Sequence, residues 1–443
     1  MINPLLEMVE KRKAGIHCGV PSFCCANKIV IEAILDQAKR SDDTVLIEAT
    51  SNQVNQNRGY TGMTPQDFTD FVYRIADKLR FSHSKIILGG DHMGPLPWVD
   101  LPEAEAMANA EVLVRACVQA GYQKIHLDTS MRLGDDPLDK PLEDAVIADR
   151  GARLYRACED EFCKLLQRDP NAVHPVYVIG SEVPIPGGSQ EEEDTVAVTT
   201  PERFEKTLLA YHQKFIELGL MDAWKYIIAM VVQPGVEFGN REIHHYDRIE
   251  AHKLCEELKK YPDIVFEGHS TDFQSPRKLR EMVEDGIAII KVGPALTFAL
   301  REALFALAHI EDELLGDSPV KSNFAAVLEH EMVSNPKNWV KYYHGSESDM
   351  ALDRKYSFSD RCRYYFANER VERAVLRLFD NLASVDIPLG MLHQYMPLQY
   401  IKVRDGKLRM DPRELAKDGV VALVEDYNYA VKSNYVTSSI FVR

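Results

Sequence analysis

Short apolar runs recur along the first 300 or so positions and alternate with segments of helical spacing. In the segment 64–79, for example, apolar side chains stand three and four positions apart, which is typical of an amphipathic helix. The apolar runs are three to ten residues long and rich in branched side chains, as in buried strands. They lie at 15–24, 44–50, 86–88, 124–128, 176–180, 225–232, 264–266 and 287–290.

Eight strands that alternate with helices predict an α/β protein, a (β/α)8 TIM barrel. A doubly wound open sheet is the rival, but no G-x-G-x-x-G turn follows the first apolar run. The alternation stops near position 315, and helical patterns with aromatic clusters follow. We therefore expect a barrel over 1–315 and a helical extension over 316–443 that packs on the barrel.

The composition narrows the classes of partner. Hydrophobic residues make up 45% of the 443 residues and charged residues 27%, as in ordinary globular proteins. The formal net charge of −16 argues against nucleic acid or an anionic membrane as the main partner. No run reaches the roughly 18 apolar residues of a transmembrane helix. The first 15 positions lack the apolar core of a signal peptide, and the eight cysteines form no C-x-x-C pair, so we expect reduced thiols in the cytoplasm.

Polar side chains follow most of the predicted strands. Reactive residues of such barrels lie at the carboxyl ends of the strands, on one face. Residues that only cap strand ends would include a mixture of Ser, Thr, Asn and Lys. The residues found here carry mainly acidic, amide and imidazole groups. The side chains concerned are Glu48, Asp91 with His92, Asp128, Glu182, Gln233, and Glu267 with His269.

A divalent metal is the first chemistry that this set suggests. His92, Glu182, Gln233 and His269 would give a nitrogen and oxygen site for Zn²⁺, with Mn, Ni, Co or Mg as alternatives. Such an ion polarises a ketone and its neighbouring hydroxyl.

Two carboxylates are candidates for proton transfer. They are Asp91 and Asp128, and Asp128 could equally support a neighbouring ligand. His126 lies two positions before Asp128 on an apolar strand, which favours a core histidine.

A phosphate site is the second suggestion. Phosphate often binds at the loops after strands seven and eight of these barrels. Ser270, Thr271 and Gly293 occupy those loops and offer hydroxyl and backbone N–H groups. Glu48 is a further candidate for substrate contact. Arg361, with Arg363 and Lys341, could reach a second anionic end, although a structural or surface role is the competing interpretation.

Several long blocks resemble one family along nearly the whole chain, the Z-type subunit of class II tagatose-1,6-bisphosphate aldolase. They include VLIEATSNQVNQ at 45–56, ILGGDH at 87–92, GSEVPIPGG at 180–188, EGHSTD at 267–272 and KVGPALTFALRE at 291–302. The resemblance implies a class II aldolase-like barrel in the breakdown of galactitol, tagatose or amino sugars.

The resemblance also implies roles for particular residues. Asp91 stands where distant class II aldolases have the proton-transfer group, and His92 and His269 where they have zinc histidines. Gln233 replaces the middle zinc histidine. That departure agrees with the family's usual description as a non-catalytic partner of a separate Y-type aldolase subunit. Other relatives resemble metal-dependent 4-epimerases of tagatose and fructose or their 6-phosphates.

Three hypotheses follow. The first is a metal-dependent enzyme acting at C3–C4 of a ketohexose phosphate, either a 4-epimerase or an aldolase. The second is an accessory subunit that stabilises a Y-type aldolase subunit. The third, a sugar isomerase or dehydratase, is disfavoured by the phosphate signal after strand seven. We expect a sugar-phosphate substrate and a homo-oligomer.

Overall fold

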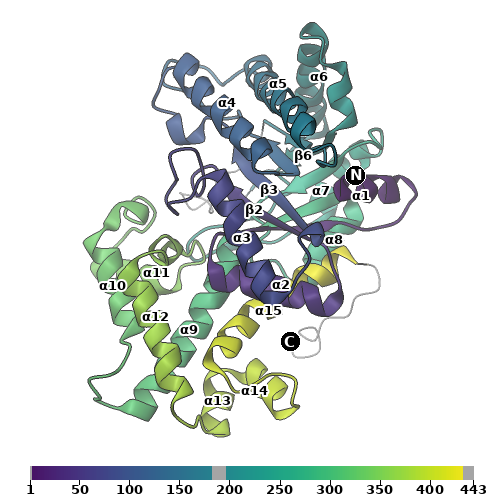
Figure 1. The fold of residues 1–443 in the computed structure, drawn as a ribbon. Coiled ribbons are helices and arrows are strands. Elements are labelled where there is room, and N and C mark those ends of the chain that lie inside the picture. The colour runs from purple at the N-terminus through teal and green to yellow at the C-terminus, as the bar shows by residue number, and fades with distance from the viewer. Residues whose placement is uncertain (1, 182–195, 433–443) are drawn as a thin grey trace.

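A closed parallel barrel forms the body of the protein, in a computed structural model that describes residues 2–181 and 196–432 (Figure 1). Around the barrel the strand order is β1-β10-β9-β6-β5-β4-β3-β2, and every neighbouring pair is parallel. The predicted (β/α)8 barrel is thereby confirmed. Its strands are β1 (Val20–Cys24), β2 (Val45–Thr50), β3 (Ile86–Met93), β4 (Lys124–Leu127), β5 (Val176–Ile179), β6 (Ile227–Val232), β9 (Val265–Gly268) and β10 (Ile287–Val292).

Each barrel strand is followed by a helix whose ends obey local rules. Thr64 and Asp67 form the capping box that the sequence predicts, and Pro65 occupies the first turn. Gly286 ends another helix with φ of 113°, a conformation that favours glycine. These helices are α2 (Lys28–Ser41), α3 (Pro65–Leu79), α4 (Glu103–Gln119), α5 (Asp144–Arg168), α6 (Pro201–Glu217), α7 (Arg248–Leu258), α8 (Pro276–Asp285) and α9 (Pro294–Leu315).

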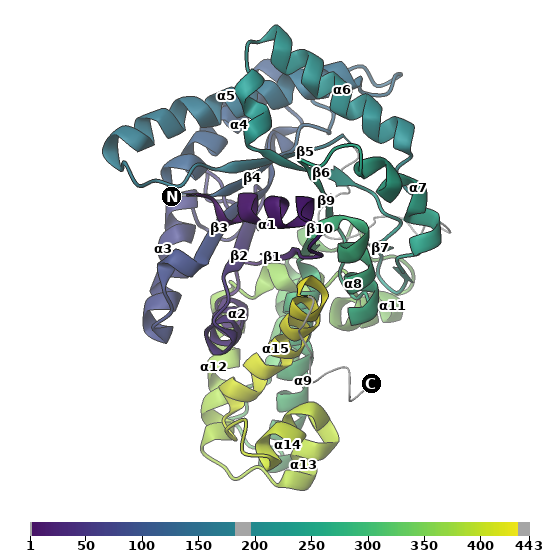
Figure 2. The same ribbon diagram turned by 90° about the vertical axis from the view of Figure 1, so that its right-hand side faces the viewer.

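The amino-terminal end of the barrel is closed by helix α1 (Pro4–Lys13), which lies across the strands in Figure 2. Leu5, Met8 and Val9 of α1 are buried among the apolar side chains that fill this end of the barrel. The side chain of Asn3 anchors the helix by donating hydrogen bonds to the carbonyl oxygens of Gln123 and His174. This end of the barrel is therefore packed, and any ligand has to enter from the opposite face.

The chain beyond α9 is mainly helical and lies along α9 on one side of the barrel (Figure 1). The last of its helices returns to the barrel and contacts α2, α8 and α9. Two aromatic stretches of this part are not α-helical. Residues 339–343 follow the short 3-10 turn η4 (Pro336–Asn338), and η5 (Arg361–Tyr365) is itself a 3-10 turn. The division at residue 315 stays a prediction. The helices are α10 (Phe324–Ser334), α11 (Glu347–Tyr356), α12 (Glu369–Ala383), α13 (Leu389–Tyr395), α14 (Pro397–Arg404) and α15 (Pro412–Val431).

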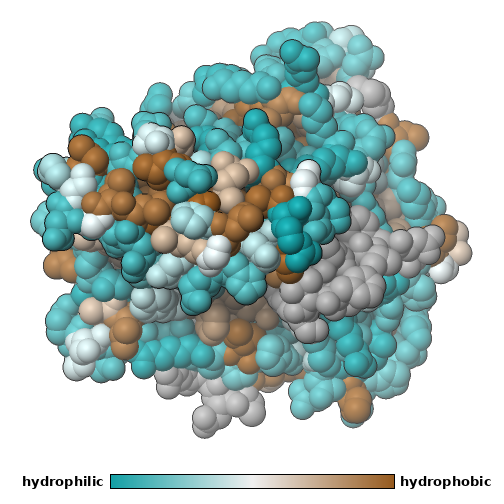
Figure 3. Space-filling model, turned by 90° about the horizontal axis from the view of Figure 1, so that it is seen from below, coloured by the Kyte–Doolittle hydropathy of each residue, from teal (hydrophilic) through white to brown (hydrophobic). Residues whose placement is uncertain are grey.

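Two further features complete the fold. A small antiparallel hairpin, β7 (Glu237–Phe238) and β8 (Ile243–His244), lies between β6 and α7 and was not predicted. Within the two described segments, no helix combines the length and the apolar character needed to cross a membrane. The surface seen from below is mostly hydrophilic, with hydrophobic side chains in several groups (Figure 3).

Candidate metal centre and substrate cavity

Three histidines and one aspartate converge at the carboxyl end of the barrel. One ligand atom from each of Asp91, His92, His126 and His269 lies within 4.8 Å of the others, and all four residues are buried. The ring centres of the histidines form a triangle, with His92 4.7 Å from His269 and 5.1 Å from His126, and His126 5.2 Å from His269. Imidazole and carboxylate groups at these separations are compatible with a metal site.

An irregularity in β3 explains how two consecutive residues both reach this cluster. Side chains normally alternate between the two faces of a strand. The register between β3 and β4 shifts between Gly90 and Met93, and His92 has a φ of 50°, in the left-handed region. A bulge of this kind redirects a side chain. It therefore allows both Asp91 and His92 to take part in the cluster.

A layer of buried charges lies next to the cluster inside the barrel. Lys124 Nζ is 2.8 Å from Oε1 of Glu48 and 2.8 Å from Oε2 of Glu267. Lys291 Nζ is 2.8 Å from Glu48 Oε2, 3.5 Å from Glu267 Oε1, and in contact with the Asp91 carboxylate. Three carboxylates thus face two ammonium groups. Buried charges are stable only when paired in this way.

Glu48 belongs to this layer, which changes the role expected for it. Its side chain is fully buried and accepts a hydrogen bond from Ser22 as well as from the lysines, so it is held away from the cavity. Gly89 stands opposite it on β3. A Cβ at Gly89 would lie 2.5 Å from Glu48 Oε1, so the glycine makes room for the carboxylate rather than for a ligand.

The protonation states differ within the cluster. Burial alone would lower the pKa of His92, but the charge of Asp91 outweighs it and raises that pKa, so His92 has to give up its proton to bind a cation. Burial lowers the pKa of His269 to about 3, so this imidazole is neutral at physiological pH, and its Nε2 pairs with Glu267 Oε1 at 2.9 Å. Burial alone would raise the pKa of Asp91, but the charges of His92 and Lys291 outweigh it and hold that pKa well below its ordinary value. The cluster therefore offers an ionised carboxylate beside a neutral imidazole.

Unsatisfied nitrogens give a direct test of whether a metal fits. His126 Nδ1 accepts a hydrogen bond from the backbone N–H of His92 at 3.2 Å. The buried atoms His126 Nε2 and His269 Nδ1 have no hydrogen-bond partner among the residues that the structure describes. Buried imidazole nitrogens normally find a partner. Their convergence with a carboxylate fits the ligand set of a divalent ion.

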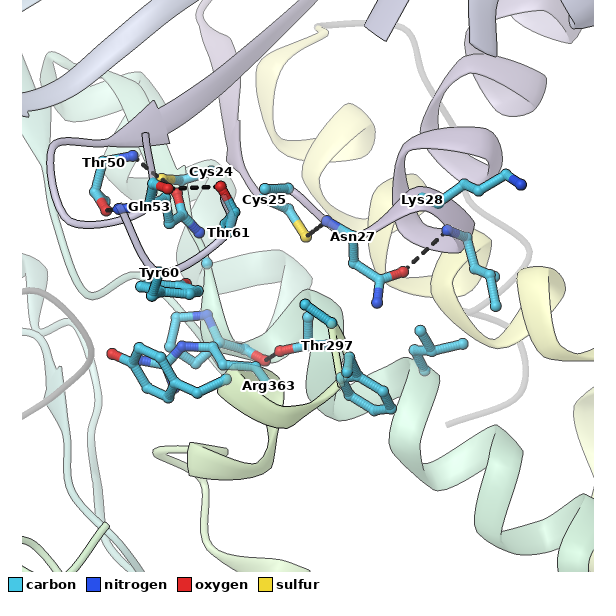
Figure 4. Close-up of a pocket in the computed structure, with 18 of the residues that line it drawn as sticks. Cys24, Cys25, Asn27, Lys28, Thr50, Gln53, Tyr60, Thr61, Thr297 and Arg363 are labelled. Carbon is cyan, nitrogen blue, oxygen red and sulfur yellow. Dashed lines mark hydrogen bonds between the residues drawn. The ribbon is translucent and has the colours of Figure 1, made fainter. Parts of the chain in front are cut away.

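A cavity of about 620 Å³ opens above this cluster. Its floor includes Asp91, His92, His269 and Lys291, all from the barrel. Figure 4 shows other lining residues, with Gln53 and Tyr60 from the loop after β2 on one side and Arg363 from η5 facing them. The C-terminal part of the chain therefore supplies one wall of the cavity.

Arg363 lines the cavity and Arg361 does not, which corrects the expectation for Arg361. Arg361 is buried, its guanidinium lies 3.3 Å from the ring centre of Tyr342, and it does not line the cavity. Arg363 does line it and donates to the backbone oxygens of Ser359 and Asp360 and to the hydroxyl of Tyr364. The short η5 turn places the two arginines in different surroundings.

The loops predicted to bind phosphate lie at the cavity, but some of their hydrogen-bond donors already donate to oxygen atoms of the protein. Ser270 and Gly293 line the cavity. The Gly293 N–H, however, donates to the carboxylate of Asp272 at 3.0 Å. Thr271 is buried, its hydroxyl donates to the Lys291 carbonyl oxygen at 2.5 Å, and it does not line the cavity. Of the three predicted residues, two therefore lie where a ligand could reach them.

Two other predicted residues, Gln233 and Asp128, do not belong to the four-residue cluster. The side-chain oxygen of Gln233 accepts hydrogen bonds from the N–H groups of Gly235 and Val236, and so stabilises the turn after β6. Asp128 is buried, and its carboxylate accepts from the N–H and the hydroxyl of Ser130 at 3.1 and 2.7 Å. Glu182 lies outside the described residues.

The fold and the cluster together define a class of protein, a (β/α)8 barrel with a buried Asp/His cluster compatible with a metal ion at its carboxyl face. The family model for D-tagatose-1,6-bisphosphate aldolase subunit GatZ/KbaZ-like proteins matches residues 5–432. The chain belongs to this family, as the resemblance in its sequence implies.

Two solved structures give the measure of similarity. One is described as a probable tagatose 6 phosphate kinase from Sinorhizobium meliloti 1021. It is 45% identical, with a TM-score of 0.83 over 93% of this chain and 100% of its own. The YdjI aldolase from Escherichia coli K12 is 11% identical, with a TM-score of 0.40 over 87% of this chain and 100% of its own.

Proposed function

We propose that the chain is a divalent-metal-dependent enzyme that acts at the C3–C4 bond of a ketohexose phosphate. The reaction is C4 epimerisation of tagatose 6-phosphate and fructose 6-phosphate by retro-aldol chemistry, or aldol cleavage of tagatose 1,6-bisphosphate. The observation that supports it is the cluster of Asp91, His92, His126 and His269, of which all but His126 line a cavity of about 620 Å³. A packed core would not need four polar side chains there.

The three histidines are the residues that would hold the metal. Three imidazoles with an open position are a common catalytic zinc set, so Zn²⁺ is our first choice, with Mn, Ni, Co and Mg as alternatives. When bound, such an ion acts as a Lewis acid on a ketone and its adjacent hydroxyl. In this proposal His126, not Gln233, is the third metal ligand. The side-chain oxygen of Gln233 instead accepts hydrogen bonds from the turn after β6.

Asp91 is the residue that we propose moves the proton. It is ionised, lines the cavity and lies 2.7 Å from Nδ1 of His92. As the C3–C4 bond breaks, the C4 hydroxyl loses its proton to Asp91, the O–H electron pair completes the aldehyde, and the bond pair remains on C3. In an epimerase the aldehyde half rotates, the bond re-forms on the other face, and Asp91 returns the proton. Asp128 is the second candidate for this role.

An accessory subunit is the second candidate function, and one observation favours it. The ammonium group of Lys291 already neutralises Asp91, so the charged cluster also has a structural explanation without any substrate. In that case the chain would stabilise a separate Y-type aldolase subunit. A cytoplasmic location and a homo-oligomer stay predictions under either function.

The test is an assay of the purified chain alone. After treatment with a chelator, the protein is reloaded with Zn²⁺, Mn²⁺, Co²⁺, Ni²⁺ or Mg²⁺ and supplied with tagatose 6-phosphate, fructose 6-phosphate or tagatose 1,6-bisphosphate. We expect turnover of at least one of them that depends on the metal. Absence of turnover with every metal, together with activation of a separate aldolase subunit, would favour the accessory function instead.

A further inference from the structure

A protein carboxylate fills the place where barrels of this kind often bind phosphate. The N-terminus of α9 follows β10, and a phosphate at such a position is bound by the free N–H groups of the helix. Here Asp272 Oδ1 accepts from the N–H of Gly293 at 3.0 Å and from the N–H of Ala295 at 2.8 Å. Asp272 is 2% exposed and lines the cavity. The helix terminus therefore already holds an anion.

A phosphate brought to this end of the cavity would meet a like charge. Burial raises the pKa of Asp272 to about 6, so the carboxylate is mainly ionised at pH 7.5. Two like charges in contact repel strongly at a partly buried site, where water screens them poorly. A sugar hydroxyl, by contrast, can donate a hydrogen bond to the free oxygen of a carboxylate. This end of the cavity therefore suits a hydroxyl group and opposes a phosphate.

Arg363 brings the opposite charge to the same cavity. Within the described residues, no carboxylate lies at ion-pair distance from its guanidinium. Asp360 is close in sequence, but its carboxylate is taken by Arg301 at 3.0 Å and by the hydroxyl of Thr297 at 2.7 Å.

The guanidinium of Arg363 is nevertheless held in place. It is bound by the backbone oxygens of Ser359 and Asp360 and by Tyr364, whose ring centre lies 4.5 Å away. The ring of Tyr60 packs 4.5 Å from that of Tyr364 and closes this part of the wall (Figure 4). An oriented guanidinium that makes no close ion pair with a carboxylate of the described residues is suited to phosphate, to which it can donate the hydrogens that these contacts leave unused.

We propose that the cavity takes a ketohexose with a single phosphate, which Arg363 binds, and that Asp272 receives a hydroxyl and excludes a second phosphate. The inference rests on the function proposed above and narrows its substrate to a monophosphate. Asp272 is then the residue that selects between the monophosphate and the bisphosphate.

Equilibrium binding tests this inference without requiring turnover. Calorimetry on the chain loaded with Zn²⁺ would compare tagatose 6-phosphate, tagatose 1,6-bisphosphate and tagatose. We expect the monophosphate to bind at least about tenfold more tightly than the bisphosphate. A bisphosphate that binds as tightly as the monophosphate would overturn the proposal.

Two variants assign the selectivity to its residues. Arg363→Gln should weaken the binding of the monophosphate at least about tenfold and leave the affinity for tagatose within about twofold of that of the wild type. Arg413→Gln is the matched control, because Arg413 also lines the cavity but is paired with Glu32 at 2.6 Å. Arg413→Gln should change neither the affinity for the monophosphate nor the affinity for tagatose by more than about twofold. Equal losses in the two arginine variants would overturn the role of Arg363.

Asp272→Asn keeps the shape of the side chain and one acceptor oxygen, and should bring the bisphosphate to within about threefold of the monophosphate. An unchanged preference would overturn the role of Asp272. Circular dichroism checks that each variant is folded. If Asp272→Asn does not fold, the preference of the wild-type chain for the monophosphate and the affinities of Arg363→Gln still test the proposal. A chain that binds the monophosphate selectively but never turns it over would defeat the proposed function alone. A chain that turns over the bisphosphate more efficiently than the monophosphate would contradict the inference about the single phosphate and leave the proposed function intact.

Discussion

The ammonium group of Lys291 and the carboxylate of Asp91 form an ion pair at the floor of the cavity. Lys291 lies near the end of β10 and Asp91 near the end of β3, so the pair joins strands that are not neighbours in the barrel. The same ammonium group contacts Glu48 and Glu267. One buried cation therefore connects the charged layer of the barrel to the candidate metal ligands, and the stability of the fold is linked to the geometry of the site.

The first prediction concerns this cation. Lys291→Met leaves three buried carboxylates with Lys124 as their remaining ammonium partner, so we expect the free energy of unfolding to fall by about 3–5 kcal/mol. Lys85→Met is the control, because its pair with Asp42 is largely exposed, and it should cost less than about 1 kcal/mol. Urea denaturation measures both. Similar losses in the two variants would show that the buried layer is not a stabilising network.

The second prediction concerns the metal. His126→Ala removes one of three converging imidazoles, so the content of bound Zn²⁺ after equilibrium dialysis should fall at least about tenfold. His174→Ala is the control, since His174 stacks on Tyr226 with ring centres 3.5 Å apart and does not belong to the cluster. Elemental analysis of the dialysed proteins gives the result. Full metal content in the His126 variant would restrict the site to the other residues.

The third prediction separates proton transfer from metal binding. Asp91→Asn keeps the three histidines and the size of the side chain but removes the base. We expect bound metal to remain while kcat falls by about 10²–10⁴-fold. Asp128→Asn, assayed in parallel, should have the smaller effect. If Asp91→Asn is as active as the wild type and Asp128→Asn is not, the proton is carried by Asp128.

The fourth prediction concerns pH. The pKa of Asp272 is raised by burial from its ordinary 3.8 to about 6 in the folded protein, so the native state binds a proton more tightly than the unfolded chain does. The stabilisation is complete below about pH 4 and is lost as the pH rises through 6, by roughly 3 kcal/mol in all.

Asp272→Asn should therefore abolish this part of the pH dependence. Urea denaturation at pH 4.5 and 7.5 measures the difference between wild type and variant. The wild type should lose more stability than the variant between the two pH values. Parallel pH profiles would show that Asp272 titrates normally.

Most of the barrel could be predicted because each element carries its own local signal. Apolar runs give the strands, and caps such as the Thr64–Asp67 box or Gly286 give the helix ends, without reference to the rest of the fold. The hairpin of β7 and β8 was missed because two-residue strands have no periodicity to detect. The apolar run 86–88 predicts a shorter strand than β3 (Ile86–Met93), because Gly89 and Gly90 interrupt the run of apolar side chains.

The site was only partly predictable, because its pairings are made across the barrel. His126 has the alternation of a core side chain, and only its neighbours on β3 and after β9 show that it faces two other histidines. The bulge at His92 is a matter of register between strands, which one strand alone does not encode. Lys124 begins the apolar run 124–128 and Lys291 directly follows the run 287–290. A lysine at such a position is itself a signal of buried carboxylates.

Helix α15 has a consequence for the order in which the protein is made. It is among the last parts of the described chain to be synthesised, yet it bridges α8 and α2, and its Tyr427 hydroxyl contacts the hydroxyl and carbonyl oxygens of Thr271 beside the cavity. While the ribosome still holds this segment, the first and seventh helices of the ring lack the element that joins them. The part of the site beside Thr271 should therefore be complete only once α15 has been synthesised and has packed against α8 and α2.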